Sequence, residues 1–175
     1  MKRLRAFFLP LMALAVSGAP LPAATPEVQV KAAYLFKLAA FVRWPDSAAA
    51  ANPFRICVAG RTDIAGSLAA LTRDQLVDGK RISVVMLGAG QAQDASGCQV
   101  LFLGRGAETA RTMLKATAGG PVLTVTDRTG GTRGGVIEFM LESGKVRLSV
   151  DRSEANAHRL ELSSKLMDAA AEVKP

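Results

Sequence analysis

Six short apolar runs of strand length recur along the chain, and they constrain the fold more than any other feature. The runs are residues 54–59, 82–87, 98–103, 121–127, 136–141 and 145–150. The third, CQVLFL, has one polar residue, which is typical of a parallel strand covered on both faces. The last two alternate in polarity and flank Glu142-Ser-Gly, a hairpin signature. The order predicts an α/β fold: a single open, mostly parallel sheet with a C-terminal antiparallel hairpin and helices on both faces.

Helical segments separate several of these runs. The first is the apolar stretch 30–45, VKAAYLFKLAAFVRWP, in which apolar residues recur at spacings of three and four. Thr25 can cap this helix with Pro26 at its first position, and Pro45 disfavours helical geometry at Trp44. Further helices are predicted over 62–75, 107–116 and 153–173.

The N-terminus has the pattern of a secretory signal peptide. Three cations within the first five residues precede an apolar run at 7–16 and the small-residue stretch SGAPLPAA. The apolar run is interrupted by Pro10 and is short for a membrane span, so cleavage is favoured over a retained anchor. We therefore expect residues 1–24 to be a signal peptide and residues 25–175 to form one exported domain that does not span the membrane.

The charge of the chain gives little support to nucleic-acid binding. The formal charge is +7, of which three positive charges lie in the leader, leaving about +4 for the remainder. The chain has one tyrosine and no run of basic residues interleaved with aromatic ones. We expect no nucleic-acid partner.

Two cysteines, Cys57 and Cys98, are compatible with a disulfide bond in an oxidising compartment. If strand 54–59 neighbours strand 98–103, as in flavodoxin-like sheets, the two cysteines could lie one strand spacing apart, which a disulfide can bridge. Two separately buried thiols are the alternative. We expect no metal site or cofactor, because the only histidine, His158, is distant and no acidic cluster has ligand spacing.

The candidate binding residues are charged, and no catalytic set accompanies them. The sequence lacks a G-x-S-x-G motif, and His158 has no serine partner at a strand end, so a hydrolase is rejected and His158 is placed at the surface or an interface. Arg61 and Arg105 follow two strands in glycine-flanked loops, where they would either bind an anion or be solvated. Glu138 and Arg147 would either form a cross-strand ion pair or contact a ligand or partner.

Taken together, the segments resemble the YfiR-like periplasmic proteins, which repress membrane-bound diguanylate cyclases in Gram-negative bacteria. The resemblance covers nearly the whole chain after the leader. Its blocks are VKAAYLFKLAAFVRWP, FRICVAG, CQVLFLG, PVLTVTD, GGVIEFMLESGKVRLSV and RLELSSKLMDAA. The first and last blocks are the specific ones. Some relatives have a second cysteine pair, which is absent here, and relatives generally have glycine where His158 stands.

The resemblance implies a periplasmic regulator without catalytic activity. Such a protein would bind the periplasmic sensor region of an inner-membrane diguanylate cyclase and repress it, lowering cyclic-di-GMP and biofilm formation. Lys31, Tyr34 and Lys37, on the expected outer face of the first helix, and His158 are then candidates for partner contact. The alternative is a periplasmic protein that binds a small anionic ligand. The sequence leaves open whether two copies form a homodimer.

Overall fold

The computed structural model describes residues 25–175, so the predicted signal peptide lies outside the described residues. The helices are α1 (Pro26–Leu38), η1 (Ala39–Phe41), α2 (Asp46–Ala49), α3 (Thr62–Thr72), η2 (Ala92–Gly97), α4 (Ala107–Thr117), η3 (Arg128–Gly130), α5 (Arg152–Ala157) and α6 (Ser164–Ala169). The strands are β1 (Val42–Arg43), β2 (Phe54–Ala59), β3 (Leu76–Val77), β4 (Lys80–Leu87), β5 (Val100–Leu103), β6 (Leu123–Asp127), β7 (Ile137–Glu142), β8 (Lys145–Asp151), β9 (Glu161–Leu162) and β10 (Glu172–Lys174).

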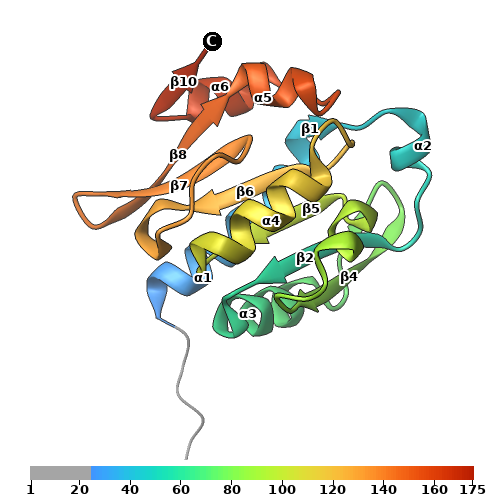
Figure 1. The fold of residues 1–175 in the computed structure, drawn as a ribbon, viewed down its shortest axis with the longest axis horizontal. Helices are drawn as coiled ribbons and strands as arrows, with labels where there is room; N and C mark the ends of the chain where they lie inside the picture. The colour runs from blue at the N-terminus through green and yellow to red at the C-terminus, as the bar shows by residue number, and fades with distance from the viewer. Residues whose placement is uncertain (1–24) are drawn as a thin grey trace, which may run out of the picture.

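The main sheet has the strand order β10-β8-β7-β6-β5-β2-β4-β3 (Figure 1). Five of its strands, from β7 to β4 in this order, are parallel neighbours, and β2 lies between β5 and β4 as in flavodoxin-like sheets. β8 runs antiparallel to β7, and β10 runs parallel to β8. The predicted open, mostly parallel sheet with its C-terminal hairpin is therefore confirmed.

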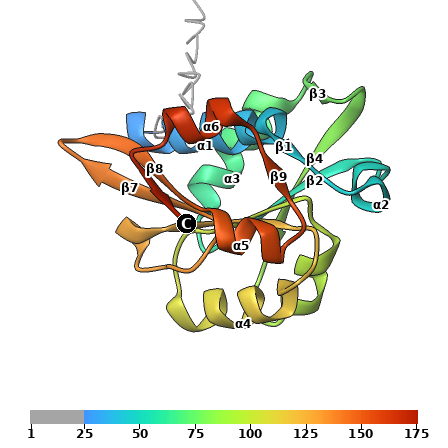
Figure 2. The ribbon, with the colours of Figure 1, turned by 90° about the horizontal axis from the view of Figure 1, so that it is seen from above.

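Helices cover both faces of this sheet, as predicted. Figure 2 shows α1, α3 and α6 on one side and α4 on the other. The larger apolar core lies on the α1 side and includes Leu35, Ile64 and Phe102. A smaller core under α4 and η2 includes Leu101 and Met113. β5 is buried throughout because its side chains alternate between these two cores.

The first helix begins where the sequence predicts and ends earlier. The Oγ1 of Thr25 accepts a hydrogen bond from the Val28 N–H at 3.5 Å, and Pro26 is the first helical residue. The helix ends at Leu38 and continues as η1 and β1, although the local stop signal lies at Pro45. The cause is tertiary, because β1 pairs antiparallel with β9 from the other end of the chain.

The long helix predicted over 153–173 is wrong. The structure has two short helices, α5 and α6, and two short strands, β9 and β10, in this segment. α5 ends at Ala157, and Arg159 adopts a left-handed conformation with φ 56° that stops the helix. β9 then pairs with β1, and β10 pairs with β8. Pairing with distant strands therefore overrides the local helical periodicity.

A disulfide bond joins Cys57 to Cys98, with 5.9 Å between their Cα atoms. The two cysteines do not face each other on paired strands, because the residue of β5 opposite Cys57 is Leu101. Cys98 instead lies where η2 leads into β5, and both cysteines are buried in the smaller core. The bond therefore ties β2 to the segment that covers one face of the sheet.

Candidate functional site

The edge of the sheet at which the parallel strands end is closed by tightly packed loops. Gly60 follows β2 with φ 76°, and a Cβ atom at this position would collide with the backbone of Arg105 in the loop after β5. Gly130 lies similarly close to the carbonyl oxygen of Gly104. Ligands often bind at this edge in open α/β sheets. Here the backbones of the loops that follow β2, β5 and β6 fill part of that space.

A buried ion-pair cluster lies directly beneath these loops. The Nζ of Lys31 in α1 lies 2.7 Å from an Asp127 carboxylate oxygen at the end of β6, and both side chains are 0% exposed. The same ammonium group donates to Glu27 at 2.6 Å and to the Thr129 hydroxyl at 2.9 Å. All three ammonium hydrogens thus have acceptors, as burial of a lysine requires. Lys31 was predicted to face a partner from the exposed side of α1, and this is wrong because α1 crosses the end of β6.

Arg61 belongs to the same cluster. Its guanidinium donates two hydrogen bonds of 2.8 Å to Asp63, and a third nitrogen lies 3.6 Å from Asp127. The hydrogen bonds from Arg61 lower the pKa of the Asp63 carboxyl, and those to Asp63 raise the pKa of Arg61. Arg105, the other predicted anion ligand, is exposed. The structure thus places Arg61 among carboxylates that an added anion would have to displace.

A second charged cluster joins η3, β7 and β10. The Nε of Arg128 donates to Glu138 at 2.5 Å, and its Nη2 donates to Glu172 in β10 at 3.1 Å. Burial raises the pKa of Glu138, but the Gly134 N–H and the Arg128 guanidinium outweigh burial and hold that pKa below its ordinary value. Lys174, 3.8 Å away, acts in the same direction.

The predicted Glu138–Arg147 ion pair does not form. The register places Ser149 opposite Glu138 and Met140 opposite Arg147, so the two charged residues are diagonal rather than opposite. Arg128 occupies the position next to Glu138, and Arg147 instead approaches Glu142 at 3.9 Å.

The remaining predicted partner contacts differ in exposure. His158 is buried, with its Nε2 3.3 Å from Glu154, so its predicted place at the surface is wrong. The reason is that His158 is the C-cap of α5 and stands between Ala155 and Leu160, which both belong to the larger core. Tyr34 is half-buried, and its ring centroid lies 6.0 Å from that of Phe139. Lys37 is exposed, as predicted.

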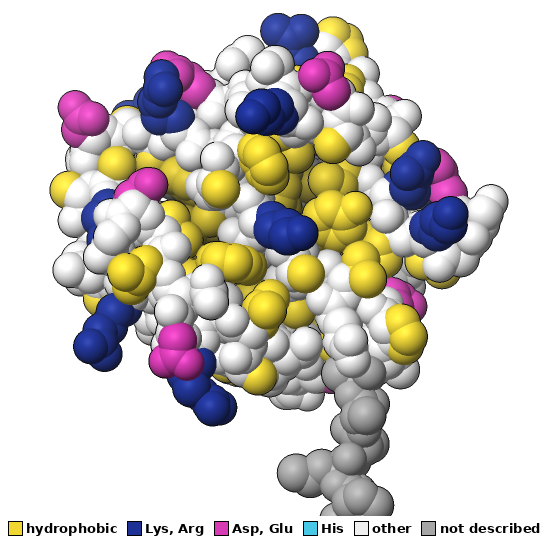
Figure 3. All heavy atoms as spheres, turned by 180° about the vertical axis from the view of Figure 1, so that it is seen from behind, with side chains coloured by type: hydrophobic (Ala, Val, Ile, Leu, Met, Phe, Trp, Pro, Cys, Tyr) yellow, Lys and Arg dark blue, Asp and Glu magenta, His cyan; other side chains and the backbone are white. Residues whose placement is uncertain are grey.

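Lys37 lies at an apolar groove on the outer face of the α1 layer. The groove has a volume of about 430 Å³. Its lining residues are Phe36, Lys37, Ala40, Phe41, Leu76, Val77 and Asp78. Leu76 from β3 contributes an apolar side chain that is 57% exposed. Figure 3 shows apolar side chains gathered in the middle of this face with basic ones among them.

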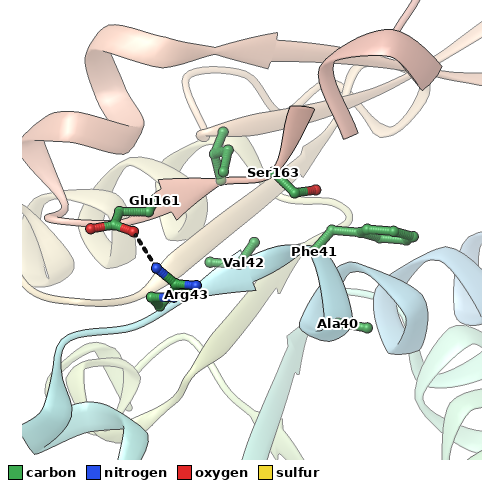
Figure 4. A pocket seen from close by; sticks show the side chains of 7 residues that line it. Ala40, Phe41, Val42, Arg43, Glu161 and Ser163 are labelled. Carbon is green, nitrogen blue, oxygen red and sulfur yellow. Dashed lines mark hydrogen bonds and ion pairs between the residues drawn. The ribbon is translucent and has the colours of Figure 1, made fainter. Parts of the chain in front are cut away.

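A second groove of about 300 Å³ continues from the first through Ala40 and Phe41. It lies along the small β1–β9 sheet, where Arg43 and Glu161 reach toward each other at 3.2 Å (Figure 4). We call the two grooves together the α1–β9 surface. Sequence reasoning missed Phe41 and Leu76, because a helix was expected through Trp44 and no strand was expected at β3.

Residues 25–175 were searched for a membrane-spanning helix and for groups of side chains that could bind a metal ion. Within this range, no helix is long and apolar enough to cross a membrane. The same residues contain no group of three or more His, Cys, Asp or Glu side chains that could hold a metal ion.

Comparisons with known proteins agree with this fold. The profile of a family described as YfiR/HmsC-like matches residues 28–171. A crystal structure described as a conserved domain protein from Vibrio cholerae O1 biovar eltor is similar, with a TM-score of 0.50 and 11% sequence identity. The match covers 84% of this chain and 60% of that one, so this chain spans less than two thirds of that protein. At this identity the similarity concerns the fold alone. No curated protein matches the chain.

Proposed function

Because residues 28–171 match its profile, the chain belongs to the YfiR/HmsC-like family, and we propose that it is a periplasmic repressor of an inner-membrane diguanylate cyclase. In this proposal the protein binds the periplasmic sensor region of the cyclase and holds the enzyme inactive. Cyclic-di-GMP and biofilm formation are lower while the complex persists. The protein itself needs no catalytic activity for this role.

The family match is the observation that carries the proposal, because it extends over almost all of the described residues. The disulfide between Cys57 and Cys98 adds support, since such bonds persist in oxidising compartments such as the periplasm. The leader-like residues 1–24 agree with export.

We assign partner binding to the α1–β9 surface. It combines an apolar floor, to which Phe41 and Leu76 contribute, with a charged rim that includes Lys37 and Arg43. Protein interfaces commonly have this composition, with apolar residues at the centre and polar residues at the edge. Of the residues predicted from sequence, Lys37 lies at this surface, whereas Lys31 and His158 are buried elsewhere.

The proposal is tested by capture and by deletion. The exported protein carrying a C-terminal tag is used to capture partners from solubilised inner membranes, and we expect a transmembrane diguanylate cyclase among them. Deletion of the gene should raise cellular cyclic-di-GMP, and the wild-type copy should restore the lower level. An unchanged cyclic-di-GMP level after deletion would contradict cyclase repression.

Binding of a small anion is the alternative that sequence reasoning left open. The ion pairs of Arg61 with Asp63 and Asp127 do not favour it. A thermal-shift series with nucleotides, amino acids and carboxylates tests this alternative directly, because a ligand that binds only the folded state raises the melting temperature.

A further inference from the structure

The two grooves of the α1–β9 surface differ in whether their charged side chains are already paired. In the groove along β1 and β9, Arg43 and Glu161 form an ion pair with each other at 3.2 Å (Figure 4). In the groove of about 430 Å³, which we call the α1–β3 groove, the charged lining residues are Lys37 and Asp78. Both are exposed, and neither side chain forms an ion pair or a hydrogen bond with any of residues 25–175. Within this range, the α1–β3 groove therefore presents an unpaired cation and an unpaired anion.

The local structure holds the two charges on separate walls of the α1–β3 groove. Val77 pairs with Lys80, so Asp78 and Gly79 are the two residues of the tight turn between β3 and β4. Both have a positive φ, of 49° and 74°, as in the hairpin turns that Asp-Gly favours. Lys37 lies in the last turn of α1, on the other side of the groove.

A partner that covers the α1–β3 groove must remove both charges from water. The remaining lining residues are apolar, so their burial favours binding. They are Phe36, Ala40, Phe41, Leu76 and Val77. Burying a charge without a counter-charge is costly, whereas an opposite charge at a matching position offsets the cost and gives specificity. The α1–β3 groove therefore disfavours a purely apolar segment and favours one that supplies both counter-charges.

We propose that the α1–β3 groove receives a segment of the membrane partner in which an apolar stretch is flanked by an acidic and a basic residue. The acidic residue pairs with Lys37 and the basic residue pairs with Asp78. The order of these charges along the segment sets the direction in which it lies. This inference rests on the partner binding proposed above and adds the chemistry of the bound segment. A second copy of this chain fits less well, because a two-fold contact would place one hollow against another and leave the apolar floor unfilled.

The test uses two variants that each remove one charge and keep the local backbone. They are Lys37→Met, which retains a good helix former, and Asp78→Asn, which retains a residue favoured in the same turn. Affinity is measured for the isolated periplasmic region of the membrane protein that the wild type captures. Each variant should raise the Kd by about tenfold or more, because the opposite charge of the partner would be buried without its counter-charge.

Lys115→Met is the matched control for Lys37→Met. Lys115 is an exposed lysine in the last turn of α4, as Lys37 is in α1, but α4 lies on the opposite side of the sheet (Figure 2). This variant should bind like the wild type. Urea unfolding should show that Lys37→Met, Asp78→Asn and Lys115→Met are all as stable as the wild type, so that a loss of binding does not come from unfolding.

The direction of the change in affinity decides between a charged and an uncharged segment. An apolar segment without charges would bind Lys37→Met and Asp78→Asn more tightly than the wild type, because these grooves cost less to desolvate. Tighter or unchanged binding would therefore overturn the proposal. Charge exchange gives a second measurement. Lys37→Glu should abolish binding, and replacing the acidic residue of the bound segment by lysine should restore it.

The outcomes separate this inference from cyclase repression. If the captured protein is not a diguanylate cyclase but both neutral variants bind it weakly, repression fails and the inference stands. If a cyclase binds the wild type and both variants equally, the inference fails and repression stands. Dimerisation of the purified protein that both variants weaken would also overturn the inference, because a second copy would then fill the groove. A wild type that captures no membrane protein overturns it as well, and the cyclic-di-GMP level after deletion decides repression separately.

Discussion

At the residue scale, the charged groups that matter to the fold are those removed from solvent. Lys31 and Asp127 are both fully buried and lie 2.7 Å apart, while Lys37 of the same helix is exposed. Removing one partner of a buried pair leaves the other as an uncompensated charge. An exposed lysine carries no such cost.

Lys31→Met should therefore destabilise the protein by about 3 kcal/mol, because Asp127 would lose its nearest cation and keep only Arg61 at 3.6 Å. Urea unfolding measures the change. The matched control is Lys37→Met, which should alter the free energy of unfolding by less than about 0.5 kcal/mol. Equal stabilities of the two variants would show that the buried pair contributes nothing.

Glu138 should contribute to the pH dependence of stability. Its folded-state pKa lies below the ordinary glutamate value of 4.5, so its stabilising contribution is fully present above that value. It is lost as the pH falls from about 4.5 through the lower folded-state pKa. We expect Glu138→Gln to be less stable than the wild type at pH 7. The difference in the free energy of unfolding should shrink as the pH falls below the ordinary glutamate pKa of 4.5. Unfolding curves measured from pH 7 to pH 3 test this, and a difference independent of pH would contradict it.

At the element scale, the disulfide joins β2 to the entry of β5 across a sequence separation of 41 residues. In the chain-entropy model, closing a loop of this length stabilises the fold by about 4 kcal/mol. Both sulfurs are buried, so the bond also belongs to the smaller core.

Reduction should therefore lower the melting temperature of the wild-type protein. The Cys57→Ala/Cys98→Ala double variant should melt at a similarly lower temperature and should not respond to reductant. In the proposed role, repression of the cyclase should weaken in parallel with the loss of folded protein. Identical melting temperatures of the wild type with and without reductant would show that the bond does not stabilise the fold.

Elements differed in how well the sequence predicted them. The apolar runs that became β2 and β5 were recognised because burial on both faces leaves few polar positions. The segment after Arg152 was misassigned, because its apolar spacing fits a helix while its short strands are stabilised by β1 and β8. A strand of two or three residues is too short to show the alternation or the apolar run by which strands are recognised in a sequence.

At the scale of the whole molecule, the α1–β9 surface is assembled from segments that are distant in sequence. Phe41 comes from η1, Leu76 from β3 and Glu161 from β9. The surface therefore exists only in the folded chain, and variants in it can separate binding from stability.

Leu76→Lys should weaken binding to the captured partner by about tenfold or more, because a charge would replace an exposed apolar contact. The free energy of unfolding should change little, since Leu76 is more than half exposed. Leu141→Lys, at a similarly exposed position outside this surface, should bind like the wild type. Binding is measured with the isolated periplasmic region of the partner. Equal affinities of the two variants would exclude this part of the α1–β9 surface from the interface.

The sequence by itself determined the class of fold, the number of the main strands, their order along the chain and the start of α1. It could do so because periodicity, capping and uniform apolarity are local properties. It also indicated the family. The tertiary structure alone decided which charges are buried, where α1 ends and which strands the C-terminal segment joins. Lys31 shows the physical reason: its position beside the apolar stripe indicates solvent, yet the end of β6 brings Asp127 within hydrogen-bond distance. Burial depends on what packs over a residue, and that is a property of the whole fold.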